Sequence, residues 1–287
     1  MTLDVSEIQT IDHDVMVIGA GGAGLRAAIE ARSHGLRTAV ICKSLFGKAH
    51  TVMAEGGIAA SMGNVNSKDS WQVHFRDTMR GGKFLNHWRM AELHAKEAPE
   101  RVWELEAWGA LFDRTAEGKI SQRNFGGHEY PRLAHVGDRT GLELIRTLQQ
   151  RIVALQQEDQ RDLGDYEARL KVFAECTITE LLKSDDGAIA GAFGYWRETG
   201  HFVARQQLRW PASRRVVVVP AVALLFGVGR LGAEHLGDVV EHEALAFGVA
   251  QHATVTAHRL GDEDALDRRR PHHARRVELD ELHVQQR

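Results

Sequence analysis

The sequence has few cysteines, an N-terminus without an apolar core, and no long apolar run. Two cysteines, Cys42 and Cys176, among 287 residues form no disulfide framework and fit a reducing compartment. The acidic N-terminus does not resemble a secretory signal. No window reaches the roughly 18 apolar residues that a membrane-spanning helix needs, and the nearest candidate, 216–229, is too short. We therefore expect any membrane association to come through a partner.

The charge balance argues against a nucleic-acid partner. The net charge is −3, with 36 basic and 39 acidic residues, so no excess of cations is available to neutralise phosphates. A hydrophobic content of 43% and a charged content of 26% are ordinary for a globular chain of one or two domains. The pair His272-His273 has no further ligands at a useful spacing, so no metal site is predicted.

A glycine-rich turn follows the first predicted strand. The apolar run 15–18 leads into a GxGxxG pattern over 19–24, a helix-forming segment over 25–33 and a second apolar strand over 38–42. This order of strand, glycine turn, helix and strand is that of a Rossmann-like unit, which binds a dinucleotide.

Each glycine of the pattern has its own task. Gly19 permits the tight turn, Gly21 lets the backbone approach a pyrophosphate, and Gly24 lets the helix pack closely on the strand. The helix N-terminus adds free N–H groups and the positive end of the helix dipole. The predicted cofactor contacts in this turn are Gly19, Ala20, Gly21, Gly22, Ala23 and Gly24.

The acidic residue that often ends the second strand of such a unit is missing. NAD and FAD sites frequently carry an acid there, about 20 residues after the glycines, to bind ribose hydroxyls. This chain has Lys43 and Ser44 instead. The exchange disfavours a plain NAD site, and the Ser44 hydroxyl is able to take over part of the hydrogen bonding.

Helices and then strands are predicted further along the chain. Apolar residues at helical spacing predict helices over 67–80 and 86–108, the second kinked or split at Pro99. A third helix, capped by Asp138 or Thr140, is expected to run to about residue 157. The strand-like segments 171–182, 188–195 and 200–204 then predict a β-meander. The fold class is therefore α/β, a Rossmann-like domain with a β-meander.

The composition changes near residue 204. No lysine follows Lys183, and half of the 16 histidines lie from His201 onward. We expect residues 1–203 to form the cofactor-binding domain. Residues 204–287 are expected to be a compositionally biased tail, either disordered or produced by a frameshift.

Several motifs give the chain a close resemblance to the succinate dehydrogenase flavoprotein subunits, within the fumarate reductase/succinate dehydrogenase/L-aspartate oxidase family. The resemblance covers about residues 12–203. The motifs are VIGAGGAGLRAA at 17–28, KAHTVMAEGGIAA at 48–60, NFGG at 124–127, HVGDRTG at 135–141 and GAIAGAFGYWRETG at 187–200. Their order and spacing make the match specific.

The resemblance implies that FAD is bonded covalently to His50. Without it, a lone histidine in a glycine loop would more often be an ordinary surface residue. Covalent attachment is typical of succinate dehydrogenases, whereas L-aspartate oxidases and soluble fumarate reductases usually lack this histidine. The same loop supplies further predicted cofactor contacts, namely Thr51, Glu55, Gly56 and Gly57. By the same resemblance, 126–127 and 138–140 are structural supports near the cofactor.

The resemblance also implies a reaction and partners. Proteins of this type oxidise succinate to fumarate with FAD. They pass electrons first to an iron–sulfur subunit, then through a membrane anchor subunit to quinone. The expected location is cytoplasmic, at the inner face of the cell membrane. The alternatives are a fumarate reductase or L-aspartate oxidase relative, or a non-catalytic FAD-binding fragment.

The family's later motifs are missing from this chain. The ATGG-type turn, the TGDG stretch and the HPTG motif of the capping domain do not occur after residue 203. The proton-donating arginine and the substrate-binding residues are missing with them. We therefore expect the capping domain to be absent, assign no catalytic residue, and expect little or no succinate oxidation by this chain.

Overall fold

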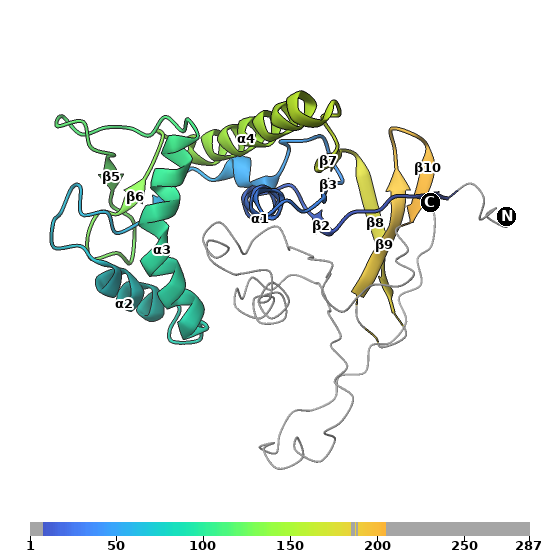
Figure 1. The fold of residues 1–287 in the computed structure, drawn as a ribbon. Helices are drawn as coiled ribbons and strands as arrows, with labels where there is room; N and C mark the ends of the chain where they lie inside the picture. Colours follow the sequence, from blue (N-terminus) through green and yellow to red (C-terminus); the bar gives the residue numbers. More distant parts are fainter. Residues whose placement is uncertain (1–7, 185–186, 188, 205–287) are drawn as a thin grey trace, which may run out of the picture. The chain divides into compact units, whose positions relative to one another are not determined.

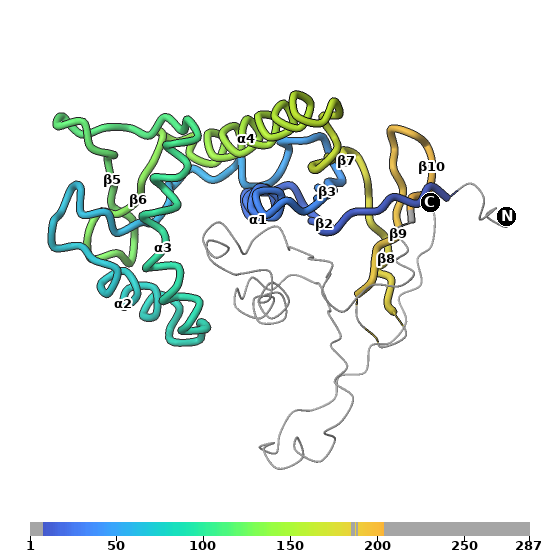
Figure 2. The backbone as a smooth tube through the Cα atoms, viewed as in Figure 1, coloured from blue at the N-terminus to red at the C-terminus, as the bar shows by residue number. Residues whose placement is uncertain are grey.

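The computed structural model describes residues 8–184, 187 and 189–204 (Figures 1 and 2). The predicted tail, 204–287, lies outside these residues except for Ala204, which ends β10. The elements are β1 (Gln9–Thr10), β2 (Val15–Ile18), α1 (Gly22–Ser33), β3 (Thr38–Ile41), the 3-10 helix η2 (His50–Met53), β4 (Ile58–Ala59), α2 (Trp71–Gly81), α3 (Trp88–Ala107), β5 (Gln122–Arg123), β6 (Leu133–Ala134), α4 (Thr140–Leu163), β7 (Leu170–Phe173), β8 (Cys176–Lys183), β9 (Ile189–Trp196) and β10 (His201–Ala204). The α/β class is confirmed.

The central sheet is parallel, in the order β2-β3-β7, and is buried on both faces. Successive side chains of a strand point to opposite faces. Val17 and Val40 accordingly belong to the core formed with α1 and α4, whereas Met16 and Ile41 belong to the core on the β-meander side. Both faces therefore need apolar residues, which explains the continuous apolar strands in the sequence.

The β-meander forms a second sheet in the order β1-β10-β9-β8. The predicted first segment, 171–182, is two strands, because the chain turns at Glu175, which has a φ of 53°. The part before this turn, β7, pairs in the central sheet, and the part after it, β8, begins the β-meander.

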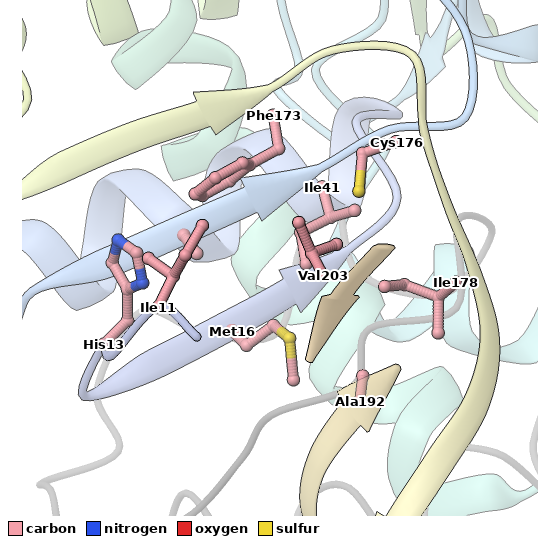
Figure 3. A pocket seen from close by; sticks show the side chains of 10 residues that line it. Ile11, His13, Met16, Ile41, Phe173, Cys176, Ile178, Ala192 and Val203 are labelled. Atoms are coloured by element: carbon pink, nitrogen blue, oxygen red, sulfur yellow. The ribbon is translucent and has the colours of Figure 1, made fainter. Parts of the chain in front are cut away.

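An apolar cavity lies between the central sheet and the β-meander (Figure 3). Met16, Ile41 and Phe173 line it from the central sheet, and Ile178 and Val203 line it from the β-meander. All but the partly buried Ile178 are buried residues of the second core. The cavity is thus part of the sheet-on-sheet packing.

The helices depart from the predictions at three points. α3 continues through Pro99, so the helix is not split there, and the alternative of a kink stays a prediction. Trp88 belongs to the apolar residues whose helical spacing predicts a buried face over 86–108, but its side chain is 53% exposed, so it is not a core residue. α4 runs to Leu163, beyond the predicted end, and its N-cap, Arg139, makes no side-chain capping bond. Neither predicted capping residue, Asp138 or Thr140, is the N-cap. The Asp138 carboxylate accepts a hydrogen bond from Arg123 at 2.9 Å, and the Thr140 hydroxyl accepts one from Val136 N–H at 3.2 Å.

A third, small sheet supports the loop that follows η2. Its order is β4-β6-β5, with both pairs antiparallel. Within the described part of the chain, no helix is long and apolar enough to cross a membrane.

Candidate cofactor site

The glycine turn is built by contacts within its own segment. Gly19 has a φ of +116°, a backbone conformation that favours glycine. Its N–H donates to the Ile41 carbonyl oxygen at 2.7 Å, which ties the turn to the end of β3. A Cβ on Gly24 would lie 1.9 Å from the Gly19 carbonyl oxygen. The protein's own backbone therefore requires glycine at 24, as close packing of helix on strand predicts.

The N-terminus of α1 is buried and lacks a side-chain cap. The N-cap residue is Gly21, the first turn contains no acidic residue, and Gly22, Ala23 and Gly24 are all buried. The preceding Ala20 is buried too. A buried helix N-terminus leaves N–H groups that need partners, and its dipole favours an anion. The arrangement is therefore suited to a phosphate group.

Lys43 and Ser44 follow β3 at the carboxyl edge of the central sheet, the same edge as the glycine turn. Lys43 is exposed and Ser44 is partly buried. Among the described residues, the Ser44 hydroxyl makes only a long contact of 3.5 Å, to the Lys48 carbonyl oxygen. Ligands of open α/β sheets bind outside the carboxyl ends of the strands. The serine hydroxyl therefore lies at the edge of the sheet where ligands of such sheets bind.

His50 begins the short 3-10 helix η2, where an irregular loop was expected. Its side chain is exposed, and no residue in the described ranges forms a hydrogen bond with its imidazole. The next residue, Thr51, accepts a hydrogen bond from Gly22 N–H at 3.2 Å through its hydroxyl. His50 is therefore held one residue from a direct contact with the α1 N-terminus.

The N-terminus of α4 holds η2 in place. Gly141 N–H donates to the Ala54 carbonyl oxygen at 2.7 Å. A Cβ on Gly141 would lie 1.9 Å from the Thr51 carbonyl oxygen, so this approach needs glycine. The motif at 135–141 thus supports η2 through Gly141, in addition to any support from residues 138–140.

The two glycines after Glu55 serve different purposes. Gly57 has a φ of +117°, and a Cβ there would lie 2.8 Å from the Ala134 carbonyl oxygen of β6. At Gly56 a Cβ would meet only Phe125, at 3.8 Å. Glycine at 57 is therefore required by the fold, whereas glycine at 56 leaves open space. Glu55 itself is exposed.

Arg123 of β5 was not predicted, and it holds this loop. Its Nε donates to the Gly56 carbonyl oxygen at 2.8 Å, and its Nη2 donates to the Glu55 carbonyl oxygen. Its Nη1 donates to Asp138 at 2.9 Å. Arg123 directly precedes the NFGG motif, which is the only sequence signal near it. The contacts themselves span too many residues to be inferred from the sequence.

A buried polar cluster of Arg132, Asp69 and Asp77 lies next to β6 in the fold. Arg132, which precedes β6, is fully buried and contacts Asp69 and Asp77 at 2.9 Å. Burial lowers the pKa of His74 to about 3 and that of His94 to about 4. Both imidazoles are therefore neutral near pH 7. No set of three potential ligands suited to a metal ion occurs among the described residues.

These features fit a dinucleotide with an attached ring system. The α1 N-terminus suits the pyrophosphate, and the Ser44 hydroxyl lies at the strand end where ribose hydroxyls bind. The open space at Gly56 lets a flat ring approach the backbone. In the sequence, His50 and Thr51 lie between Ser44, on the nucleotide side, and Gly56, on the ring side.

The comparisons with known proteins agree with this site. The sequence profile of the FAD binding domain family matches residues 14–282, so the chain belongs to this family of FAD-binding proteins. The match runs past residue 204, and the domain boundary there stays a prediction.

Individual relatives are fumarate reductase and succinate dehydrogenase subunits. The chain is 43% identical over 189 residues to a fumarate reductase (CoM/CoB) subunit of Methanothermobacter marburgensis, covering 66% of this chain and 32% of that protein. It is 46% identical over 145 residues to the succinate dehydrogenase flavoprotein subunit of Rickettsia bellii, covering 48% of this chain and 24% of that protein.

A solved structure, Mycobacterium smegmatis Sdh1 in complex with UQ1, has 74% identity and a TM-score of 0.69, covering 74% of this chain and 34% of that one. The chain thus spans about a third or less of these relatives' length. The resemblance to succinate dehydrogenase flavoprotein subunits is confirmed.

Proposed function

We propose that this chain is the FAD-holding part of a succinate dehydrogenase-type flavoprotein subunit, with FAD attached covalently at His50. The observation that carries the proposal is the position of His50. It is exposed and precedes Thr51, whose hydroxyl contacts the α1 N-terminus. One short turn therefore provides both an attachment point and a neighbour of the phosphate site.

The residues of the site have distinct proposed tasks. The N-terminus of α1 and the turn before it, with Gly19, Ala20, Gly21, Gly22, Ala23 and Gly24, hold the pyrophosphate. The N–H groups of Gly19 and Gly22 already donate to Ile41 and Thr51, so these two glycines shape the turn and the other backbone N–H groups bind the phosphates. Lys43 and Ser44 face the nucleotide end, with the Ser44 hydroxyl bound to ribose. Thr51, Glu55, Gly56 and Gly57 line the ring side. When bound, FAD supplies the two-electron acceptor chemistry that no side chain offers.

The chain's own residues provide no assigned acid or base for the substrate. None of the arginines and histidines in 1–203 occupies a family motif for proton donation or carboxylate binding. General acid–base groups each contribute about 10²–10⁴-fold in rate. We expect the purified chain to reduce an electron-accepting dye with succinate at less than about a thousandth of the rate of a complete flavoprotein subunit.

Partners and location follow from the family as proposals. An iron–sulfur subunit would accept the electrons, and a membrane anchor subunit would pass them to quinone. The chain would then lie in the cytoplasm at the inner face of the membrane. The direction of the reaction has a second candidate, because one relative is named a fumarate reductase.

We further propose a frameshift near residue 204, although the FAD binding domain profile extends to residue 282. The support is the change in composition there and the missing later motifs. Translating the coding DNA in all frames tests a frameshift. Recovery of ATGG and HPTG motifs in another frame is the expected result, and their absence from every frame would rule the frameshift out.

The proposed attachment is tested by denaturing the full chain in acid and recording flavin fluorescence in the gel. The wild-type chain should retain fluorescence, and His50→Ala should lose it. His34→Ala, an exposed histidine just after α1, is the matched control and should behave as wild type. Complete loss of flavin from the wild type would contradict attachment at His50.

A further inference from the structure

Arg123 presents three donors to the loop and to its neighbour. Two of them, Nε and Nη2, reach the carbonyl oxygens of Gly56 and Glu55. The third, Nη1, reaches Asp138, whose side chain is 81% exposed. A guanidinium is a rigid planar fork, so a single side chain fixes two successive peptide groups.

The direction of these carbonyl groups fixes the direction of two amides. In a trans peptide, the carbonyl group and the following N–H point in opposite directions. The described residues contain no cis peptide bond. Since the carbonyls of Glu55 and Gly56 both turn toward Arg123, the N–H groups of Gly56 and Gly57 point away from it. Neither amide is a donor in the hydrogen bonds of the described turns and loops.

Two neighbouring amides that point to one side form a site for negative charge or for a hydrogen-bond acceptor. The open space at Gly56, where a Cβ would meet only Phe125 at 3.8 Å, leaves room for an acceptor. A flavin ring carries such acceptors along one edge. The amides of Gly56 and Gly57 are thus available to it only while the peptide groups keep this orientation.

We propose that Arg123 is a positioning residue for the flavin: it holds the Glu55–Gly57 backbone so that the amides of Gly56 and Gly57 face the ring. Asp138 orients the guanidinium from the opposite side. This inference rests on the proposed function, because it takes FAD as the ligand of the site.

Arg123 acts on the loop more than on the stability of the fold. Its side chain is 32% exposed, and its carboxylate partner is largely in water. Exposed ion pairs contribute little to folding. Loss of Arg123 should therefore release the loop without unfolding the β4-β6-β5 sheet.

The test measures FAD affinity by fluorescence quenching in the full chain carrying His50→Ala, where attachment is excluded. Adding Arg123→Ala should raise the Kd at least about tenfold, because two charge-assisted hydrogen bonds to the loop are lost. Arg123→Lys should give an intermediate Kd. Free guanidinium, well below denaturing concentrations, should restore part of the affinity of Arg123→Ala. A merely structural loss would not be rescued in this way.

The matched control is Arg114→Ala. Arg114 likewise donates to a backbone carbonyl, that of Gly118 at 3.3 Å, and pairs with a carboxylate, Glu106. It has no hydrogen bond to the 50–57 loop, and its loss should leave the Kd within about twofold.

An unchanged Kd in Arg123→Ala, or an equal loss in Arg114→Ala, would overturn the role of Arg123. Failure of the His50→Ala chain to bind FAD at all would overturn the proposed cofactor site and this inference with it. Attachment is judged separately, from the denatured wild-type chain.

Discussion

The two halves of the cofactor site are built in different ways. The glycine turn over 19–24 is held by contacts inside one β-α-β unit, such as the approach of Gly24 to Gly19. The loop over 50–57 is held by residues far along the chain, including Arg123, which lies 67 positions from Gly56 and 68 from Glu55. A phosphate turn is thus carried by a short segment, whereas the ring-side loop needs the rest of the domain.

The largest loss of stability and FAD binding is expected from a substitution in the glycine turn over 19–24. Gly24→Val places its Cβ against the Gly19 carbonyl oxygen, 1.9 Å away, so the helix must move from the strand. Overpacking of this kind costs about 3 kcal/mol of unfolding free energy. Urea unfolding should record this loss, with loss of FAD binding. Gly126→Ala, where a Cβ meets nothing within 4 Å, should change stability by less than about 0.5 kcal/mol. Equal stability of the two variants would refute the close packing.

Substitutions at Gly56 and Gly57, in the loop over 50–57, should have different effects: one should weaken FAD binding and the other should lower the stability of the fold. Gly57→Ala forces a φ of +117° on alanine and meets Ala134, so it should cost about 2 kcal/mol of unfolding free energy. Gly56→Ala meets only Phe125 at 3.8 Å and should leave unfolding unchanged. In the His50→Ala background, where attachment is excluded, it should instead weaken FAD binding about tenfold, because its methyl group lies where the ring would approach. The comparison fails if Gly56→Ala destabilises the chain as much as Gly57→Ala does.

Acid should weaken the support of the distant half. Burial lowers the pKa of His74 to about 3 and of His94 to about 4 in the folded chain. Unfolding returns them to about 6.5, so the unfolded state binds protons first as the pH falls. Stability is therefore present above pH 6.5 and is lost below it, by about 2 kcal/mol per histidine between pH 6.5 and 5.

Urea unfolding at the two pH values measures this loss. His74→Gln should remove about half of the dependence and leave the contribution of His94, whereas His201→Gln, at an exposed position, should not change it. A wild-type stability that is constant down to pH 5 would contradict the role given to burial.

The smallest effect is expected at Ser44. Its hydroxyl has only the 3.5 Å contact with the Lys48 carbonyl oxygen, so Ser44→Ala should leave folding unchanged. In the His50→Ala background, loss of one neutral hydrogen bond to ribose should weaken FAD binding about fivefold. Ser33→Ala, at the exposed end of α1, is the control. A titration that finds equal affinities would place the ribose elsewhere.

The sequence was sufficient for the local half of the site. The apolar run and the glycine spacing predicted β2, α1 and β3 within a few residues, because short-range packing and turn geometry determine them. The tasks assigned to Gly19 and Gly24 match their geometry in the structure. The β-meander was also predicted, since its turns and alternating strands are local features.

The distant half could be located by resemblance but not explained. Nothing in the spacing of 50–57 indicates that Gly57 packs on Ala134, or that Gly141 approaches Thr51. Tertiary contacts also overrode two local signals: α3 passes through Pro99, and the strand predicted over 171–182 divides between two sheets at Glu175. Such contacts have no signature in a single segment.

Peptide mapping of the full chain after denaturation and proteolysis tests covalent attachment at His50 directly. The peptide containing His50 should carry the mass of FAD in the wild type, and no peptide should carry it in His50→Ala. Recovery of all the flavin as free FAD from wild-type chain, or its attachment to a different residue, would contradict the central claim.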